Sequence, residues 1–390
     1  MNDHPVPVHL ANTGISNLHR GNGATITYAR RPSTVRVTES EAGDSGLVSR
    51  LVHLDTDRFD LRRGLPGAAL VLIPLVVGFA LGLAEASVLV TIGALNLLLV
   101  QSPSPATTRW KVLLVAAAGN TIAFGAGTLV GLAPRTVEIP LVAVGIVVSL
   151  IATGAGEWES SGFMAAVMFS FAVGIPPTTL AGIGLRPAAV LLGGVWTLAM
   201  LSLVQVLRPA YRTGLAPPSQ GASNAPKTPF PRLAVHSCVT ASAVVVGLLI
   251  GIDLGLPRDY WIMLTVLVAL RLDLSSTFGY AAARILGTVA GAGVAFAVTI
   301  STADPWILFP ILAVTTVLCL ATRGVNYALY AVWITLTVIL LLNLVYSGGP
   351  SLAIARVIDT LIGGSLALIA AVALAATSRG RAGRSSTTPS

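Results

Sequence analysis

Long apolar runs separated by short polar turns recur along the chain from residue 65 to residue 377. Most of them approach the roughly 20 residues that a helix needs to cross a bilayer. None alternates apolar and polar residues over about ten positions, as the strands of a membrane β-barrel do. The pattern predicts an all-α integral membrane protein with about 12 transmembrane helices. The expected spans lie near 65–83, 86–100, 112–132, 139–153, 162–175, 188–207, 233–252, 260–272, 281–300, 306–321, 327–346 and 352–376.

The apolar runs fall into two blocks of six. Residues 63–207 form the first expected six-helix membrane repeat, and residues 233–377 form the second. A Pro-rich segment, 208–232, links the blocks and is too short to be a domain. Residues 1–62 form a polar and largely disordered tail, and residues 378–390 form a basic tail.

The two blocks also resemble each other in sequence. LRPAAVLLGG (185–194) aligns with ARVIDTLIGG (355–364) at an offset of 170 residues, which pairs Arg186 with Arg356. Thr91 aligns with Thr265 at an offset of 174. With an even number of spans in each block, the repeats are expected to be parallel and related by an axis along the membrane normal.

The net charge of +8 follows membrane topology and is not a nucleic-acid signal. Most of the 24 Lys and Arg residues lie in the N-terminal tail, the linker, the C-terminal tail and alternate turns. Because positively charged loops stay in the cytoplasm, both termini and the linker are expected there. The Arg residues that fall toward the other side are Arg135, Arg186, Arg258 and Arg356.

One apolar run in the second block is unusually short. The ten residues from Trp261 to Leu270 follow Tyr260 and end at Arg271 and Asp273, and the corresponding run in the first block ends in Ser and Pro. Short or interrupted segments at matching places in two repeats indicate a transport site. A helix that ends within the membrane exposes backbone polar groups, which only protein or water can satisfy. The alternative is an ordinary helix end followed by a polar loop.

Ionisable residues inside the apolar runs are the other candidates. Arg356 and Asp359 are three residues apart and share a helix face, so they can pair and face an anionic substrate. The alternative is a structural pair that joins two helices. Arg284 heads a glycine-rich helix and is either a site residue or a side chain that reaches the inner interface. Arg186 has no acidic partner at the matching position, which favours the second block as the functional one. Glu85 and Asp259 are expected to be solvated turn charges.

No catalytic constellation is visible in the sequence. Motifs of serine hydrolases, zinc proteases and phosphate-binding loops are missing, which argues against an enzyme. Cys238 and Cys319 lie far apart inside apolar runs, and four of the five His residues precede the first span. Neither a metal site nor a cofactor is therefore expected.

The second block resembles the fusaric acid resistance protein-like family. The resemblance rests on Tyr260-Trp261-x-x-Leu264-Thr265-Val266, on Arg284-x-x-Gly287-Thr288 and on Arg356-x-x-Asp359-Thr360-x-x-Gly363. This family is grouped with aromatic acid exporters and, more distantly, with plant aluminium-activated malate channels. The resemblance implies six-helix units in the cytoplasmic membrane that export organic carboxylates, driven by the proton gradient. The matching positions are Tyr260, Trp261, Thr265, Arg284, Arg356 and Asp359.

The chain departs from larger members of that family in two ways. It has no soluble domain between the blocks, and Arg271-Leu272-Asp273 replaces their usual Gln-Pro. We expect a secondary exporter of small, aromatic carboxylates, with an anion channel or a non-transporting scaffold in envelope assembly as alternatives. The expected partners are a small organic anion and the lipid bilayer, but no nucleic acid. Whether the chain forms a homo-oligomer is left open.

Overall fold

The computed structural model describes residues 54–100, 106–152, 159–207, 229–271, 274–346 and 348–385. These ranges contain a short 3-10 turn, η1 (Thr56–Arg58), and twelve α-helices, with no strand among them. The predicted all-α class is confirmed. Most of the N-terminal tail and of the Pro-rich linker lie outside the described residues. The helices are α2 (Leu61–Ala80), α3 (Ala84–Leu99), α4 (Ala106–Gly131), α5 (Arg135–Ala152), α6 (Glu159–Val173), α7 (Leu180–Leu207), α8 (Phe230–Asp253), α9 (Tyr260–Ala269), α10 (Leu274–Ser301), α11 (Pro305–Thr322), α12 (Tyr327–Asn343) and α13 (Pro350–Ser385).

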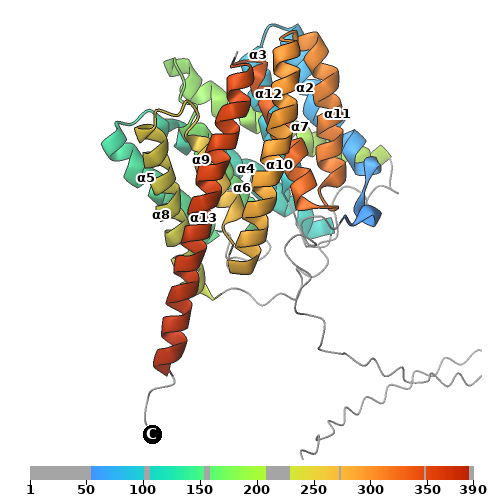
Figure 1. Cartoon of the computed structure of the whole chain (residues 1–390). Coiled ribbons are helices and arrows are strands. Elements are labelled where there is room, and N and C mark those ends of the chain that lie inside the picture. Colours follow the sequence, from blue (N-terminus) through green and yellow to red (C-terminus); the bar gives the residue numbers. More distant parts are fainter. Residues whose placement is uncertain are drawn as a thin grey trace, which may run out of the picture. The chain divides into compact units, whose positions relative to one another are not determined.

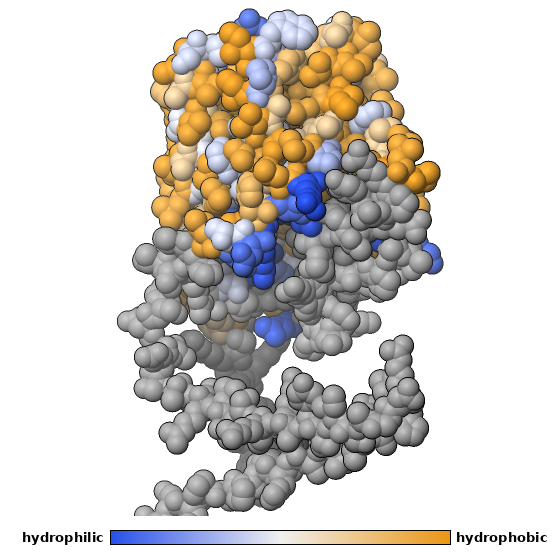
Figure 2. All heavy atoms as spheres, turned by 90° about the vertical axis from the view of Figure 1, so that its right-hand side faces the viewer, coloured by the Kyte–Doolittle hydropathy of each residue, from blue (hydrophilic) through white to orange (hydrophobic). Residues whose placement is uncertain are grey.

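The helices have the length and surface of a membrane protein. Eight of those described are long and apolar enough to cross a membrane, while α3, α6, α9 and α12 are shorter. Many large apolar side chains are exposed, and on the face shown in Figure 2 apolar residues cover most of the helical body. Hydrophilic residues gather at the lower margin of that face. This distribution is the one expected of a surface in contact with lipid.

Local sequence signals set several helix starts. Asn326 accepts hydrogen bonds from the backbone N–H groups of Ala328 and Leu329 at the start of α12. Asp304 accepts one from Trp306 N–H at the start of α11. Such side chains satisfy backbone donors that have no partner inside the helix. At the other end of the chain, α13 continues to Ser385 rather than ending at the predicted residue 376, and it projects below the other helices (Figure 1).

The turns between helices gather at two ends of the molecule. One of them is the upper end in the orientation of Figure 1. It holds the turns 81–83, 132–134, 174–179, 254–259, 302–304 and 344–349. Contacts between turns hold this end together: Arg186 pairs with Glu85, and Arg258 lies over the Tyr346 ring. The lower end holds the start of α2 and the ends of α3, α9 and α11.

Corresponding helices pack in corresponding pairs in the two halves. In the first half α3 packs on α7 and α4 on α6, and in the second half α9 packs on α13 and α10 on α12. The halves are joined in the same reciprocal way, because α2 packs on α11 while α8 packs on α5. Residues 45–390 therefore form a single compact unit.

Two adjacent glycines place α13 close to both of its partners. A Cβ atom at Gly363 would lie 2.7 Å from the Thr265 Cβ on α9. A Cβ atom at Gly364 would lie 3.0 Å from the Ile285 Cδ1 on α10. Small residues allow membrane helices to approach closely, so this pair brings α9, α10 and α13 together around their polar side chains.

Candidate functional site

Helix α9 is short and fully enclosed by other helices. Its ten residues span about 15 Å, half the thickness of a bilayer core. Tyr260, Trp261 and Thr265 are all 0% exposed, and the Thr265 hydroxyl donates to the Trp261 carbonyl over 2.9 Å. Trp261 is thus an interior residue and not an anchor at the membrane interface.

Arg356 lies against Trp261 in this interior. The Arg356 side chain belongs to α13, is 4% exposed, and places its Cζ 5.1 Å from the centre of the Trp261 ring. A guanidinium over an aromatic face is attracted by the ring electrons. Its Nη1 has no hydrogen-bond partner among the described residues. A buried cation with an unused donor is well suited to receive an anion.

The predicted direct pair between Arg356 and Asp359 differs from the structure. Asp359 is 0% exposed, and neither of its carboxylate oxygens has a partner within the described ranges. The three-residue spacing does place the two side chains on neighbouring faces of α13, but Arg356 turns toward the Trp261 ring instead. The two groups influence each other through their charges and not through a hydrogen bond.

Arg284 adds a second buried cation. It sits on α10, which packs along α13, and is 7% exposed. Its Nε finds no partner in the part of the chain that the structure describes, and its charge repels that of Arg356. Arg284 thus lies largely inside the helix bundle, beside Arg356.

Arg284, Arg356 and Asp359 form what we call the interior cluster. Arg271 lies apart from it, at the lower end. Its guanidinium is stacked on the Tyr280 ring of α10, 4.2 Å from the ring centre. Its backbone N–H donates to the Thr277 hydroxyl over 2.9 Å. The other candidate residue of this segment, Asp273, lies outside the described residues. Arg271 therefore marks the break between α9 and α10 but is not brought into the interior cluster.

The first half uses its corresponding arginine differently. Arg186 donates from Nε and Nη2 to Oε1 of Glu85, at 3.0 and 2.5 Å, and from Nη1 to the Ile175 carbonyl. The position that matches Asp359 is Ala189, as the sequence showed, but Arg186 finds an acidic partner elsewhere, so Glu85, although 52% exposed, is not only a solvated turn charge. The partner comes from another helix, α3, which comparison along one helix misses. The offset of 174 residues that relates Thr91 to Thr265 also relates Glu85 to Asp259.

The end of the other short helix is also satisfied by protein. Arg323, which follows α11, donates to the carbonyls of Leu98 and Leu99 at the end of α3. A cation at a helix C-terminus interacts favourably with its partial negative charge. Sequence reasoning missed this contact because Arg323 belongs to the other half of the chain. It is the kind of partner that a helix ending at membrane depth requires.

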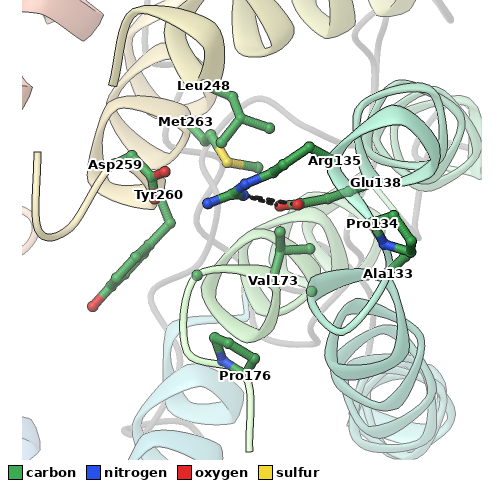
Figure 3. Close-up of a pocket in the computed structure, with 12 residues that line it drawn as sticks. Ala133, Pro134, Arg135, Glu138, Val173, Pro176, Leu248, Asp259, Tyr260 and Met263 are labelled. Carbon is green, nitrogen blue, oxygen red and sulfur yellow. Dashed lines mark hydrogen bonds and ion pairs between the residues drawn. The ribbon is translucent and has the colours of Figure 1, made fainter. Parts of the chain in front are cut away.

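A cavity of about 350 Å³ opens at the upper end, next to the start of α9. In Figure 3 its polar side chains are Arg135 and Glu138 of α5 and Asp259, which precedes α9. Arg135 Nη1 donates to both Glu138 oxygens, over 2.7 and 2.8 Å. The remaining lining residues are Gly131, Ala133, Pro134, Val173, Gly174, Pro176, Leu248, Tyr260 and Met263.

The interior cluster and the cavity offer different chemistry. Arg284, Arg356 and Asp359 together carry an excess of one positive charge, so the interior favours a monoanion. No group of three or more metal-ligating side chains is found among the described residues.

The comparisons with known proteins each cover about a third of the chain. Residues 240–370 match the model of the family described as fusaric acid resistance protein-like. A stretch of 140 residues is 34% identical to the inner membrane protein YccS of Escherichia coli, covering 36% of this chain but only 19% of YccS. No solved structure matches the chain. The chain is thus a multi-pass membrane protein, and its residues 240–370, from α8 to α13, form a fusaric acid resistance protein-like region.

Proposed function

We propose that this protein is a secondary transporter that exports small organic, aromatic carboxylates across the cytoplasmic membrane. The observation that carries the proposal is the buried pair of arginines, Arg284 and Arg356, whose guanidinium groups retain unused donors among the described residues. Uncompensated charge inside a membrane protein is expensive and marks substrate or ion pathways. A carboxylate bound between α10 and α13 would relieve the repulsion between the two cations.

The surroundings of the cluster favour an aromatic substrate. Trp261 offers a ring face beside Arg356, and the Tyr280 and Tyr327 rings lie 4.7 Å apart between α10 and α12. Aromatic side chains pack well against aromatic ligands, while the arginine fork fixes the carboxylate. In this proposal Arg284 and Arg356 bind the anion and Trp261 contacts its ring. Arg271 attracts the anion at the lower end, and Asp359 is the coupling group.

The proposed orientation of the protein in the membrane follows from the positions of its charges. The lower end carries the start of α2 and the end of α13, with Arg58, Arg62, Arg63 and Arg323 near it. Because such positive ends stay in the cytoplasm, we propose that the lower end and both termini are cytoplasmic. The reciprocal packing of corresponding helices supports an arrangement of two parallel repeats around the substrate path.

The test is uptake of labelled benzoate into energised inverted membrane vesicles. We expect uptake that a protonophore abolishes, and a loss of about tenfold or more in Arg356→Gln and in Arg284→Gln, because each removes a charged donor. Arg186→Gln is the matched control, since it removes the corresponding arginine of the first half, and it should retain uptake per molecule of protein.

The two alternative functions, a channel and a scaffold, predict different results in this assay. Benzoate flux that persists without a proton gradient would indicate a channel. If the wild-type protein moves no member of a panel of aliphatic and aromatic carboxylates, the transporter proposal is wrong and a scaffold role gains support.

A further inference from the structure

The cavity at the upper end combines an acidic wall with an apolar floor. Leu248 and Met263 are both almost fully buried and form part of the floor, together with Val173. In Figure 3 the guanidinium of Arg135 reaches into the cavity from one side, and Asp259 lies on the other. At about 350 Å³ the cavity falls within the range of small-molecule sites.

The charges around the cavity do not cancel. The Glu138 side chain is 3% exposed and is matched by Arg135, which accounts for one positive and one negative charge. Asp259 forms no ion pair with any residue that the structure describes. The cavity therefore retains one negative charge, located where the carboxylate of Asp259 meets the apolar floor.

The corresponding helices of the other half pack through aromatic side chains. There, α11 and α2 replace α5 and α8 as the paired helices. Phe79 of α2 packs edge-on against Phe309 of α11, with ring centres 5.2 Å apart, and Trp306 packs against Phe309 at 5.6 Å. The two pairs of helices therefore meet through different side chains, aromatic rings in one pair and charged groups in the other.

We propose that this cavity binds a small organic cation, an ammonium group attached to an apolar body. The ammonium would donate to the Asp259 carboxylate, and the apolar body would rest on Leu248 and Met263. An anion would face the uncompensated Asp259, and a neutral molecule would gain only the apolar contact. Neither Arg284 nor Arg356 lines this cavity, and its existence does not depend on carboxylate transport.

The experiment measures binding of three ligands of matched shape to the full-length protein in detergent. Benzylammonium, benzyl alcohol and benzoate share a ring and differ in charge. Isothermal titration should show benzylammonium binding most tightly at the site. Asp259→Asn should weaken benzylammonium binding by about tenfold or more, since a charged hydrogen bond is lost, and should change benzyl alcohol binding little. Asp253→Asn is the matched control, because Asp253 is an exposed acid at the end of α8 outside the cavity.

A second variant keeps the test decisive if Asp259→Asn does not fold. Ala133 lies in the half-exposed turn at the cavity, so Ala133→Trp should fill the space without disturbing a helix core and should abolish benzylammonium binding. Circular dichroism confirms that each variant is folded. Unchanged benzylammonium affinity in either variant, or tighter binding of benzoate at a site that Ala133→Trp removes, would overturn the proposal.

Discussion

Arg186 Nη2 lies 2.5 Å from Glu85 Oε1, and this ion pair has no equivalent in the second half. The corresponding residues there are Arg356 and Asp259, which form no ion pair among the described residues. In the first half Arg186 joins α7 to α3, whereas in the second half Arg356 is stacked on the Trp261 ring. Residues of the same two types thus form an ion pair in one half and none among the described residues of the other.

Breaking the Arg186–Glu85 pair from its two sides should have unequal effects. Glu85 is 52% exposed and Arg186 only 11%. Glu85→Gln should therefore lower the free energy of unfolding by about 1 kcal/mol or less, because water screens an exposed partner. Arg186→Gln also loses the bond to the Ile175 carbonyl and should cost about 1–3 kcal/mol. Thermal unfolding in detergent compares the two, and equal losses would contradict this assignment.

Adding one methyl group at Gly363 should separate α13 from α9. A Cβ atom there would lie 2.7 Å from the Thr265 Cβ and 2.8 Å from the Ile262 carbonyl oxygen. Gly363→Ala should therefore destabilise the fold by about 1–3 kcal/mol and reduce transport. Gly293→Ala is the control, since Gly293 has nothing within 4 Å, and it should be neutral or stabilising by up to about 1 kcal/mol. A Gly363→Ala variant as stable as Gly293→Ala would refute the close approach.

The proposed orientation can be checked with single cysteines in a variant that lacks Cys238 and Cys319. Leu254 is exposed at the upper end and Arg58 at the lower end. In intact cells, a membrane-impermeant thiol reagent should label Leu254→Cys but not Arg58→Cys, and in inverted vesicles the result should reverse. Labelling of Arg58→Cys in intact cells would place the lower end outside.

Binding of benzylammonium should weaken on acidification at an unusually high pH. Burial raises the pKa of the Asp259 carboxyl from 3.8, while Arg135 acts in the opposite direction. Glu138, Arg258 and Asp359 are the other charged groups near it. Only the ionised carboxylate attracts a cation, so affinity is full above this pKa and is lost as the pH falls through it. Titrations between about pH 4 and pH 8 should show that loss in the wild type and not in Asp259→Asn.

The sequence predicted the helices well because apolar run length is a local property. The interruption after α9 was visible as a run of ten apolar residues, and the structure has it. Contacts between the halves could not be read in this way. Glu85 with Arg186, and Arg323 with the end of α3, join residues that are 101 and more than 200 positions apart. Spacing on one helix suggested that Arg356 pairs with Asp359, but the nearby Trp261 ring redirected the arginine.

The exchange of packing between the halves has a consequence for biosynthesis. Helix α2 rests on α11, where Gly67 meets Leu320, and α5 rests on α8. The ribosome completes α2 and α5 long before it makes α11 and α8. The half-synthesised chain therefore lies in the bilayer while the faces of α2 and α5 still lack their partner helices. The first half cannot complete its packing until those helices are made. The synthesis of α8 and α11 completes the assembly of the helices. A truncated or stalled chain would therefore expose the unpaired faces of α2 and α5 to membrane quality-control proteases.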